Sequence, residues 1–216
     1  MSVSLTQLAR FMTSDPAAQI KVVEDAKYPD SDESRAQAKY YRETLDRARL
    51  HHNAGKAPAY LPAEAQALRV QAGQSPKRRT RDRLHNNARA IDDYAAHFST
   101  RGFQVLRGKR LALRFHGVEV RVTPDFVVRE RGLEKMVKLY CKTAEPTPTY
   151  VRIVCQAMFE AAVQAGWPAG QTMTPARVRF LDLHRGADHK GARMGARMST
   201  NIAAACRQIS LIWPAV

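Results

Sequence analysis

No uninterrupted apolar stretch in the sequence approaches the roughly 20 residues that a helix needs to cross a lipid bilayer. The first residues, MSVSLTQLARFMTSDPAAQ, also lack a basic segment followed by a long apolar core, which is the pattern of a secretory signal. Apolar residues still make up 44% of the 216 residues, an ordinary fraction for a globular protein. We therefore expect a cytoplasmic protein that has no membrane partner.

Cysteine is scarce as well, and its spacing excludes two common uses. Cys141, Cys155 and Cys206 are odd in number, far apart and set in apolar surroundings. A disulfide framework needs paired cysteines, and a zinc site of the CxxC type needs closely spaced ones. The three residues are predicted to be buried free thiols.

Acidic residues are in short supply relative to basic ones. The chain has 35 Lys and Arg against 20 Asp and Glu, a formal net charge of +15 and a pI near 10.2. Residues 1 to 50 contain eight residues of each sign, so the whole excess lies in residues 51 to 216. This balance favours DNA or RNA as the partner, because each phosphate that a cation neutralises releases counterions.

Residues 1 to 60 are predicted to form an N-terminal helical module. Leu5 to Met12 is a short amphipathic run, and Ser14-Asp15-Pro16 is a helix start that precedes Ala17 to Lys27. A longer helix is expected from Glu33 to about His52, before the linker NAGKAPAYLP. This module is a candidate contact for protein partners.

Residues 61 to 216 are predicted to form an α+β domain in which helices flank a mixed β-sheet. Two helices come first, from Pro62 to Gln71 and from Ser75-Pro76 to Gly102. From Phe103 the sequence alternates, and glycine-containing turns such as Arg131-Gly132 predict an antiparallel meander. The chain then continues with a helix from Tyr150 to Ala165, the strand RVRFLDL, a glycine-rich loop with His184, Asp188 and His189, and a helix from Met198 to Trp213.

Basic residues gather at two places in this domain. One cluster opens the helix that follows Ser75-Pro76, and the other lies in the near-repeat KGARMGARM. Such clusters are often only a solvated surface, but five cations against Asp82 in the first one favour contact with phosphates. The predicted nucleic-acid-binding residues are Lys77, Arg78, Arg79, Arg81, Arg83, Arg193 and Arg197.

Candidate catalytic residues lie at the ends of two predicted neighbouring strands. Pro124-Asp125 interrupts one run, and the next run ends in Tyr140-Cys141-Lys142. Because side chains alternate along a strand, Tyr140 and Lys142 are expected to share a face. An Asp and a Lys on neighbouring strands can hold a divalent metal ion and steady a phosphate.

In this order of elements, residues 76 to 183 resemble the PD-(D/E)xK nuclease superfamily, the fold of many restriction enzymes and RecB-like nucleases. The resemblance rests on Pro124-Asp125, on the strand that ends in Lys142, on the helix that contains Gln156 and on the later strand Val178 to Leu183. It implies a nuclease-like core, Asp125 as a metal ligand and Lys142 and Gln156 as catalytic residues. It also implies Mg²⁺ or Mn²⁺ as the cofactor if the protein is active, and otherwise no cofactor.

The sequence departs from the family pattern at Tyr140, where the superfamily places its second acid. A phenol is a poor Mg²⁺ ligand at neutral pH, because this hard cation prefers carboxylates. Two residues are candidate replacements: Glu119, on the strand before Asp125, and Glu160, one helical turn after Gln156 and a second candidate metal ligand. The alternative is that Gln156 and Glu160 only form the solvent-facing stripe of their helix.

Three functions therefore compete. The first is a metal-dependent endo- or exonuclease with a displaced acid, Glu160 or Glu119. The second is a nucleic-acid-binding protein whose nuclease-like core has degenerated, in a defence, repair or mobile-element system. The third is a basic structural or regulatory subunit of a nucleoprotein complex. Tyr140 favours the second, which is the function that we expect.

Overall fold

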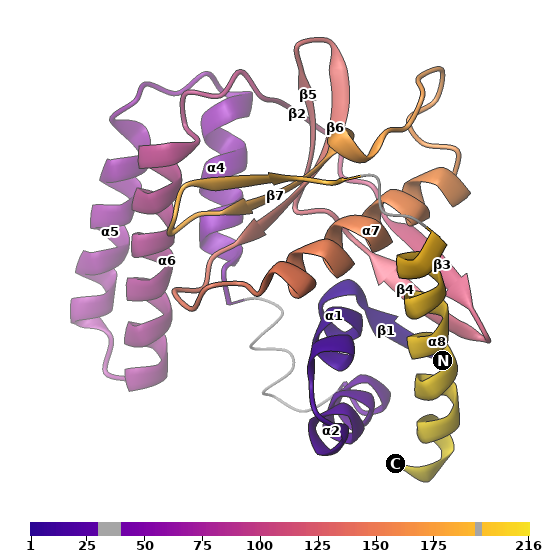
Figure 1. Ribbon diagram of the computed structural model, residues 1–216. Helices are drawn as coiled ribbons and strands as arrows, with labels where there is room; N and C mark the ends of the chain where they lie inside the picture. Colours follow the sequence, from indigo (N-terminus) through magenta and orange to yellow (C-terminus); the bar gives the residue numbers. More distant parts are fainter. Residues whose placement is uncertain (30–39, 193–195) are drawn as a thin grey trace.

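The computed structural model describes residues 1–29, 40–192 and 196–216 (Figure 1). The helices are α1 (Leu5–Thr13), α2 (Pro16–Lys27), α4 (Arg42–Asn53), α5 (Tyr60–Gln74), α6 (Arg78–His97), α7 (Pro148–Gln164) and α8 (Ala196–Ile212), with short 3-10 turns η1 (Pro175–Arg177) and η2 (Trp213–Ala215). The strands are β1 (Ser2–Ser4), β2 (Gln104–Leu106), β3 (Leu111–Phe115), β4 (Val118–Val122), β5 (Phe126–Glu130), β6 (Leu133–Tyr140), β7 (Val178–Asp182) and β8 (Ala187–Lys190). The predicted α+β class is confirmed. Of the helix expected from Glu33, residues 33 to 39 lie outside the described part.

Helix starts follow the local signals in the sequence. Ser4 and Gln7 form a capping box at α1, in which each side chain accepts a hydrogen bond from the backbone N–H of the other residue. Asp15 caps α2, whose first residue is Pro16. Thr147 caps α7, which also begins with a proline. These helices begin where side-chain acceptors satisfy backbone donors that have no partner within the helix.

The strands form two sheets rather than the single antiparallel meander that we expected. One sheet has the order β1-β4-β3, and the other has the order β2-β5-β6-β7-β8. The β3–β4 hairpin thus leaves the larger sheet, and β2 pairs directly with β5. The change of sheet occurs at Thr123-Pro124, because proline has no N–H with which to continue a ladder. The meander prediction was therefore wrong at this point.

Two short strands were also missed. β1 pairs in parallel with β4, and its three residues are too few to show a hydrophobic period. β8 pairs antiparallel with β7 over a segment that we expected to be a loop. Its four residues, ADHK, carry no apolar alternation, and an ion pair between Arg179 and Asp188 joins the two strands. Tertiary contacts specify both strands.

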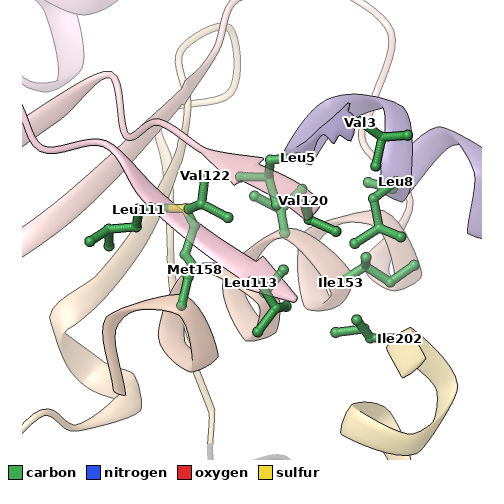
Figure 2. Packing of buried hydrophobic residues seen from close by; sticks show 14 of the residues in the cluster. Val3, Leu5, Leu8, Leu111, Leu113, Val120, Val122, Ile153, Met158 and Ile202 are labelled. Carbon is green, nitrogen blue, oxygen red and sulfur yellow. The ribbon is translucent and has the colours of Figure 1, made fainter. Parts of the chain in front are cut away.

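Two hydrophobic cores lie in this fold. The first joins α1, α2, α7 and α8 to the smaller sheet. In Figure 2 the side chains of Leu8, Leu113, Ile153 and Ile202, which come from α1, β3, α7 and α8, point into the same space. The second lies between the larger sheet and the layer of α4, α5 and α6 (Figure 1). Alternate residues of β6 serve the two cores, with Met136 in the first and Val137 and Leu139 in the second. Helices therefore cover both faces of the larger sheet.

Contacts cross the domain boundary that we expected at residue 60. Helices α1 and α2 contact α8, whereas α4 contacts α5 and α6. The described residues of the N-terminal segment are thus divided between the two cores, and the boundary itself stays a prediction. Within the described ranges, none of the helices is long and apolar enough to cross a membrane.

Candidate functional site

The register of one hairpin sets the residues around Asp125. Arg131 and Gly132 both have positive φ, 52° and 76°, and form a tight two-residue turn between β5 and β6. This turn pairs Phe126 with Val137, and the N–H of Asp125 donates to the carbonyl of Val137 at 3.0 Å. Extending the antiparallel ladder by one residue places Asp125 opposite Lys138 on the same face. A lysine of β6 itself, rather than one beyond its end, thus faces the aspartate.

Both carboxylate oxygens of Asp125 accept hydrogen bonds. Lys138 Nζ donates to Oδ1 at 2.9 Å, and the N–H of Leu139 donates to Oδ2 at 2.8 Å. The side chains of Asp125 and Lys138 are only 12% and 23% exposed. Burial by itself lowers the pKa of Lys138, but the nearby Asp125 outweighs it and raises that pKa. Lys138 therefore carries a positive charge at neutral pH.

Tyr140 lies one step further along the same face. Its ring packs against Phe180, with centroids 5.6 Å apart, and against Tyr150 at 6.2 Å. Burial, followed by the influence of Tyr150 and Asp182, raises the pKa of its phenol. The phenol is neutral at physiological pH and cannot replace a carboxylate as a ligand for a hard cation.

Cys141 belongs to the opposite face of β6, toward the second core. Burial raises the pKa of its thiol, and the negative charge of Asp125 acts in the same direction. A nucleophilic cysteine needs a lowered pKa, because the thiolate is the reactive form. Cys141 is therefore a structural thiol, although it is half-buried and not fully buried as the sequence predicted, whereas Cys155 and Cys206 are buried free thiols as predicted.

Asp182 is a buried acid that sequence reasoning missed. It is the last residue of β7, it is fully buried, and it pairs in register with Tyr140. Arg185 Nη1 donates to its Oδ2 at 3.1 Å. Its signal was present in the sequence, since it is the only charged residue in the second half of the apolar strand RVRFLDL. Asp125, directly before β5, and Asp182, at the end of β7, thus lie at the same edge of the larger sheet on either side of β6, each with its own cationic partner.

The other residues predicted for the catalytic site do not gather around Asp125. Lys142 is exposed beyond the end of β6. Gln156 and Glu160 bond to each other on α7, and Ser199 of α8 also donates to Glu160. Glu119 belongs to the smaller sheet, where Arg114 binds its carboxylate at 2.7 Å. The catalytic roles of these residues stay predictions, but the structure places them in separate environments.

The arrangement does not fit a divalent metal ion. Both oxygens of Asp125 are already used, Asp182 is paired, and Tyr140 is a neutral phenol. In the described part of the chain, no group of three or more His, Cys, Asp or Glu side chains could hold a metal ion. We therefore derive no step of a reaction through Mg²⁺ or Mn²⁺.

The predicted basic clusters are partly used within the fold. Arg83 forms an ion pair with Glu43 of α4, and Arg81 donates to the backbone carbonyls of Ser75 and Pro76. At the start of α6 the exposed cations are Lys77, Arg78 and Arg79, and of these only Arg78 has an acidic neighbour among the described residues, Asp82 at 3.8 Å.

The second basic cluster is far from the first. Arg193 lies outside the described residues, and Arg197 is exposed in the first turn of α8. In Figure 1 the start of α6, at the lower left, and the start of α8, at the right, lie on opposite sides of the molecule. Among the described residues, Arg197 therefore does not share one continuous patch with the start of α6. A further basic loop between β2 and β3, with exposed Arg107, Lys109 and Arg110, was missed although its letters RGKR are plain in the sequence.

Comparison of the chain with protein-family models, with curated proteins and with solved structures found no match.

Proposed function

We propose that the protein binds nucleic acid through a core of the PD-(D/E)xK type whose cleavage site has degenerated. The observation that carries this proposal is the ion pair of Asp125 with Lys138 at the start of β5. It lies in a sheet where β6, α7 and β7 form a parallel crossover unit, and α6 precedes the strands. This order supports the resemblance seen in the sequence, and the closed ion pair supports the loss of cleavage.

Loss of cleavage follows from the ligands that a metal would need. Mg²⁺ requires near-octahedral oxygen coordination, and one carboxylate that already accepts two hydrogen bonds supplies little of it. A metal ion would have to displace Lys138, which would leave a mostly buried ammonium group without a partner. The Asp125–Lys138 ion pair is thus expected to be more stable than a state in which Asp125 binds a metal ion.

Binding is supported by the distribution of charge. The net charge of +15 lies in residues 51 to 216, and Lys77, Arg78 and Arg79 project from the first turn of α6 and the residue before it. These side chains are exposed and not consumed by strong ion pairs, so they are available to phosphates. The expected role is backbone contact, which positions nucleic acid without reading its sequence.

The binding experiment measures the anisotropy of labelled single-stranded DNA, duplex DNA and RNA over a range of salt concentrations. We expect affinity to fall steeply with salt, and the slope of log affinity against log salt to shrink by about one for each phosphate-contacting cation removed. The test variant changes Lys77, Arg78 and Arg79 to Gln. The matched control changes three exposed cations elsewhere, Lys21, Arg131 and Arg207, and loses the same total charge. A control that weakens binding as much as the test variant overturns the proposed surface.

The cleavage experiment follows the same nucleic acids over time with Mg²⁺ or Mn²⁺. We expect no cleavage by the native protein. Metal-dependent cleavage that Asp125→Asn abolishes would overturn the degenerate site and establish a nuclease. If Glu160→Gln or Glu119→Gln also abolished it, that residue would be the displaced acid.

A further inference from the structure

A second charged site lies at the other end of β6 and β7. There the structure contains a cavity of about 410 Å³ between the start of β6, η1 and the end of β8. Its polar lining consists of Lys135, Arg177, Arg179, Lys190 and two threonines, Thr172 and Thr174. None of its lining residues in the described part of the chain is acidic. The cavity therefore has a strongly cationic wall.

A network of ion pairs next to the cavity neutralises only part of this charge. Arg101 bonds to Glu130 and Asp188, Lys135 bonds to Glu130, and Arg179 bonds to Asp188. The network thus contains three cations and two carboxylates. Arg179 and Lys135 obtain their partners from it, and among the described residues one positive charge of the network is left over.

Arg177 adds a second unneutralised charge. The residue is only 9% exposed, and among the described residues its guanidinium donates only to the neutral side-chain oxygen of Gln171. Its Nε and its other Nη have no hydrogen-bond partner among the described residues. Both atoms keep some exposure to solvent, because neither is among the fully enclosed polar atoms that lack a hydrogen bond. A buried guanidinium without a carboxylate is costly unless another anion approaches it. Arg177 is itself a lining residue of the cavity.

Lys190 brings a third charge to the same wall. It pairs directly with Arg179 across the antiparallel β7–β8 ladder, so the two side chains share a face. Like charges directly opposite each other on neighbouring strands repel and destabilise a sheet. Lys190 is exposed and forms no ion pair within the described ranges, whereas Arg179 is paired with Asp188, so the charge of Lys190 itself is not neutralised.

Close backbone contacts hold the wall in place. The N–H of Gly191 donates to the carbonyl of Val178 at 2.9 Å, which ties the end of β8 to the start of β7. A Cβ at position 191 would lie 2.4 Å from the carbonyl oxygen of Pro175 in η1, so only glycine fits there. Arg177 and Lys190 are thus fixed on segments that touch each other, and the site is formed before any ligand binds.

We propose that this cavity binds a phosphoryl group, with Arg177 and Lys190 as its charged ligands. Arg177 offers planar donors to two phosphate oxygens, Lys190 offers a point charge, and the hydroxyls of Thr172 and Thr174 can donate to the remaining oxygens. The group is carried either by a small free phosphate compound or by the terminal phosphate of an oligonucleotide. The site is separate from the start of α6 and does not rest on the proposed function.

The first test is calorimetric titration of the native protein with pyrophosphate at low salt. We expect saturable binding, weakened roughly ten-fold by Arg177→Gln and by Lys190→Gln, because each loses a charged hydrogen bond. Lys190 is exposed, so its variant folds even if Arg177→Gln does not. The matched control is Lys109→Gln, an exposed lysine of the β2–β3 loop that loses the same charge outside the cavity.

A second titration distinguishes the two sources of the phosphoryl group. It compares a short oligonucleotide with a 5′-phosphate with the same oligonucleotide ending in a 5′-hydroxyl. A preference for the phosphate that Lys190→Gln removes identifies a nucleic-acid end, whereas pyrophosphate binding with no such preference identifies a small free ligand. Absence of saturable pyrophosphate binding and of any 5′-phosphate preference overturns the proposal, and so does equal weakening by Lys109→Gln.

These outcomes are independent of the surface at the start of α6. If the variant of Lys77, Arg78 and Arg79 loses nucleic acid but keeps pyrophosphate, the cavity stands alone. If the native protein binds pyrophosphate and no nucleic acid, the proposed function fails and the phosphoryl site remains.

Discussion

The two ends of β6 and β7 differ in the balance of acidic and basic side chains. At the end that contains Asp125 and Asp182, each carboxylate is matched by a single cation, Lys138 or Arg185. At the end that contains Arg177 and Lys190, cations outnumber the carboxylates of the network beside them. The first end is where the sequence predicted chemistry, and the second is where an anion is needed.

The difference shows what a charged cluster can do in this fold. A buried ion pair that is complete leaves no site for a ligand, because each group has already replaced its lost water. A buried cation with a neutral partner keeps part of its desolvation cost, which an incoming anion can relieve. In this fold the proposed anion site is therefore marked by cations that lack a carboxylate partner, and not by the number of charged residues alone.

The largest effect is expected from opening the complete pair. Asp125→Asn leaves Lys138 mostly buried without a carboxylate and should lower the free energy of unfolding by about 3 kcal/mol. The double variant with Lys138→Met should be more stable than Asp125→Asn alone, since both charges are then removed. Urea unfolding of the single and double variants measures this coupling. A double variant that shows the plain sum of two large losses would mean that the pair is not the stabilising unit.

A smaller loss is expected at the opposite end, together with a gain in binding. Glu130→Gln removes a partner from Arg101 and Lys135 and should cost about 2 kcal/mol, because Arg101 keeps Asp188. The cavity then gains one net positive charge, so pyrophosphate should bind roughly three- to ten-fold more tightly. Calorimetry and urea unfolding of the same sample separate the two effects. Weaker pyrophosphate binding by a folded variant would contradict the excess of cations.

Acid should affect the network through its two carboxylates. Burial by itself raises the pKa of Glu130 and of Asp188, but hydrogen bonds from Lys135 and Arg101 to the former, and from Arg179 and Arg101 to the latter, outweigh it and lower both. A lowered folded-state pKa gives stabilisation that is complete above the unfolded-state value and is lost as the pH falls through the folded-state one. The free energy of unfolding should therefore begin to decrease below about pH 5, where free Asp and Glu begin to protonate, and should fall further at lower pH.

The measurement is urea unfolding at a series of pH values between neutrality and the acid transition. Glu130→Gln supplies the control, since it removes one of the two titrating groups and should flatten the dependence. An unchanged slope in this variant would show that other carboxylates dominate the acid transition.

The smallest effect is expected from the lysine that the sequence favoured. Lys142→Gln changes an exposed side chain beyond the end of β6, and the free energy of unfolding should change by less than about 0.5 kcal/mol. Lys138→Gln, four residues earlier, should cost clearly more because it leaves Asp125 unpaired. Thermal unfolding of the two variants side by side checks this order. Equal losses would break the distinction between the two lysines.

Much of the fold followed from local signals. The helices that begin at Leu5, Pro16 and Pro148 begin at capping residues, and the hairpin turns contain glycines with positive φ. The same turn at Arg131-Gly132 also fixes Lys138 opposite Asp125, so this pair could have been found by counting residues back from the turn. The family pattern instead favours Lys142, which lies beyond the end of β6.

Other features had no local signal. The departure of β3 and β4 into a second sheet depends on β1, which lies more than 100 residues earlier in the chain. Arg83 is an ordinary member of a basic run in the sequence, and only the position of Glu43 on α4 makes it a structural residue. In the sequence Asp182 is only an acid at the end of a strand, and the tertiary structure makes it a fully buried carboxylate paired with Arg185.

The sequence by itself determined the capped helices, the longer strands, the turn that joins β5 to β6, and the total charge of +15 with its place after residue 50. Only the tertiary structure decided which of those charges cancel. Ion pairs such as Arg101 with Asp188 join residues that are far apart along the chain, and Coulomb energy depends on distance in space and on burial rather than on order in sequence. For this reason Arg177 is one arginine among many in the sequence. In the fold it is a buried cation whose hydrogen-bond partner among the described residues is the neutral Gln171.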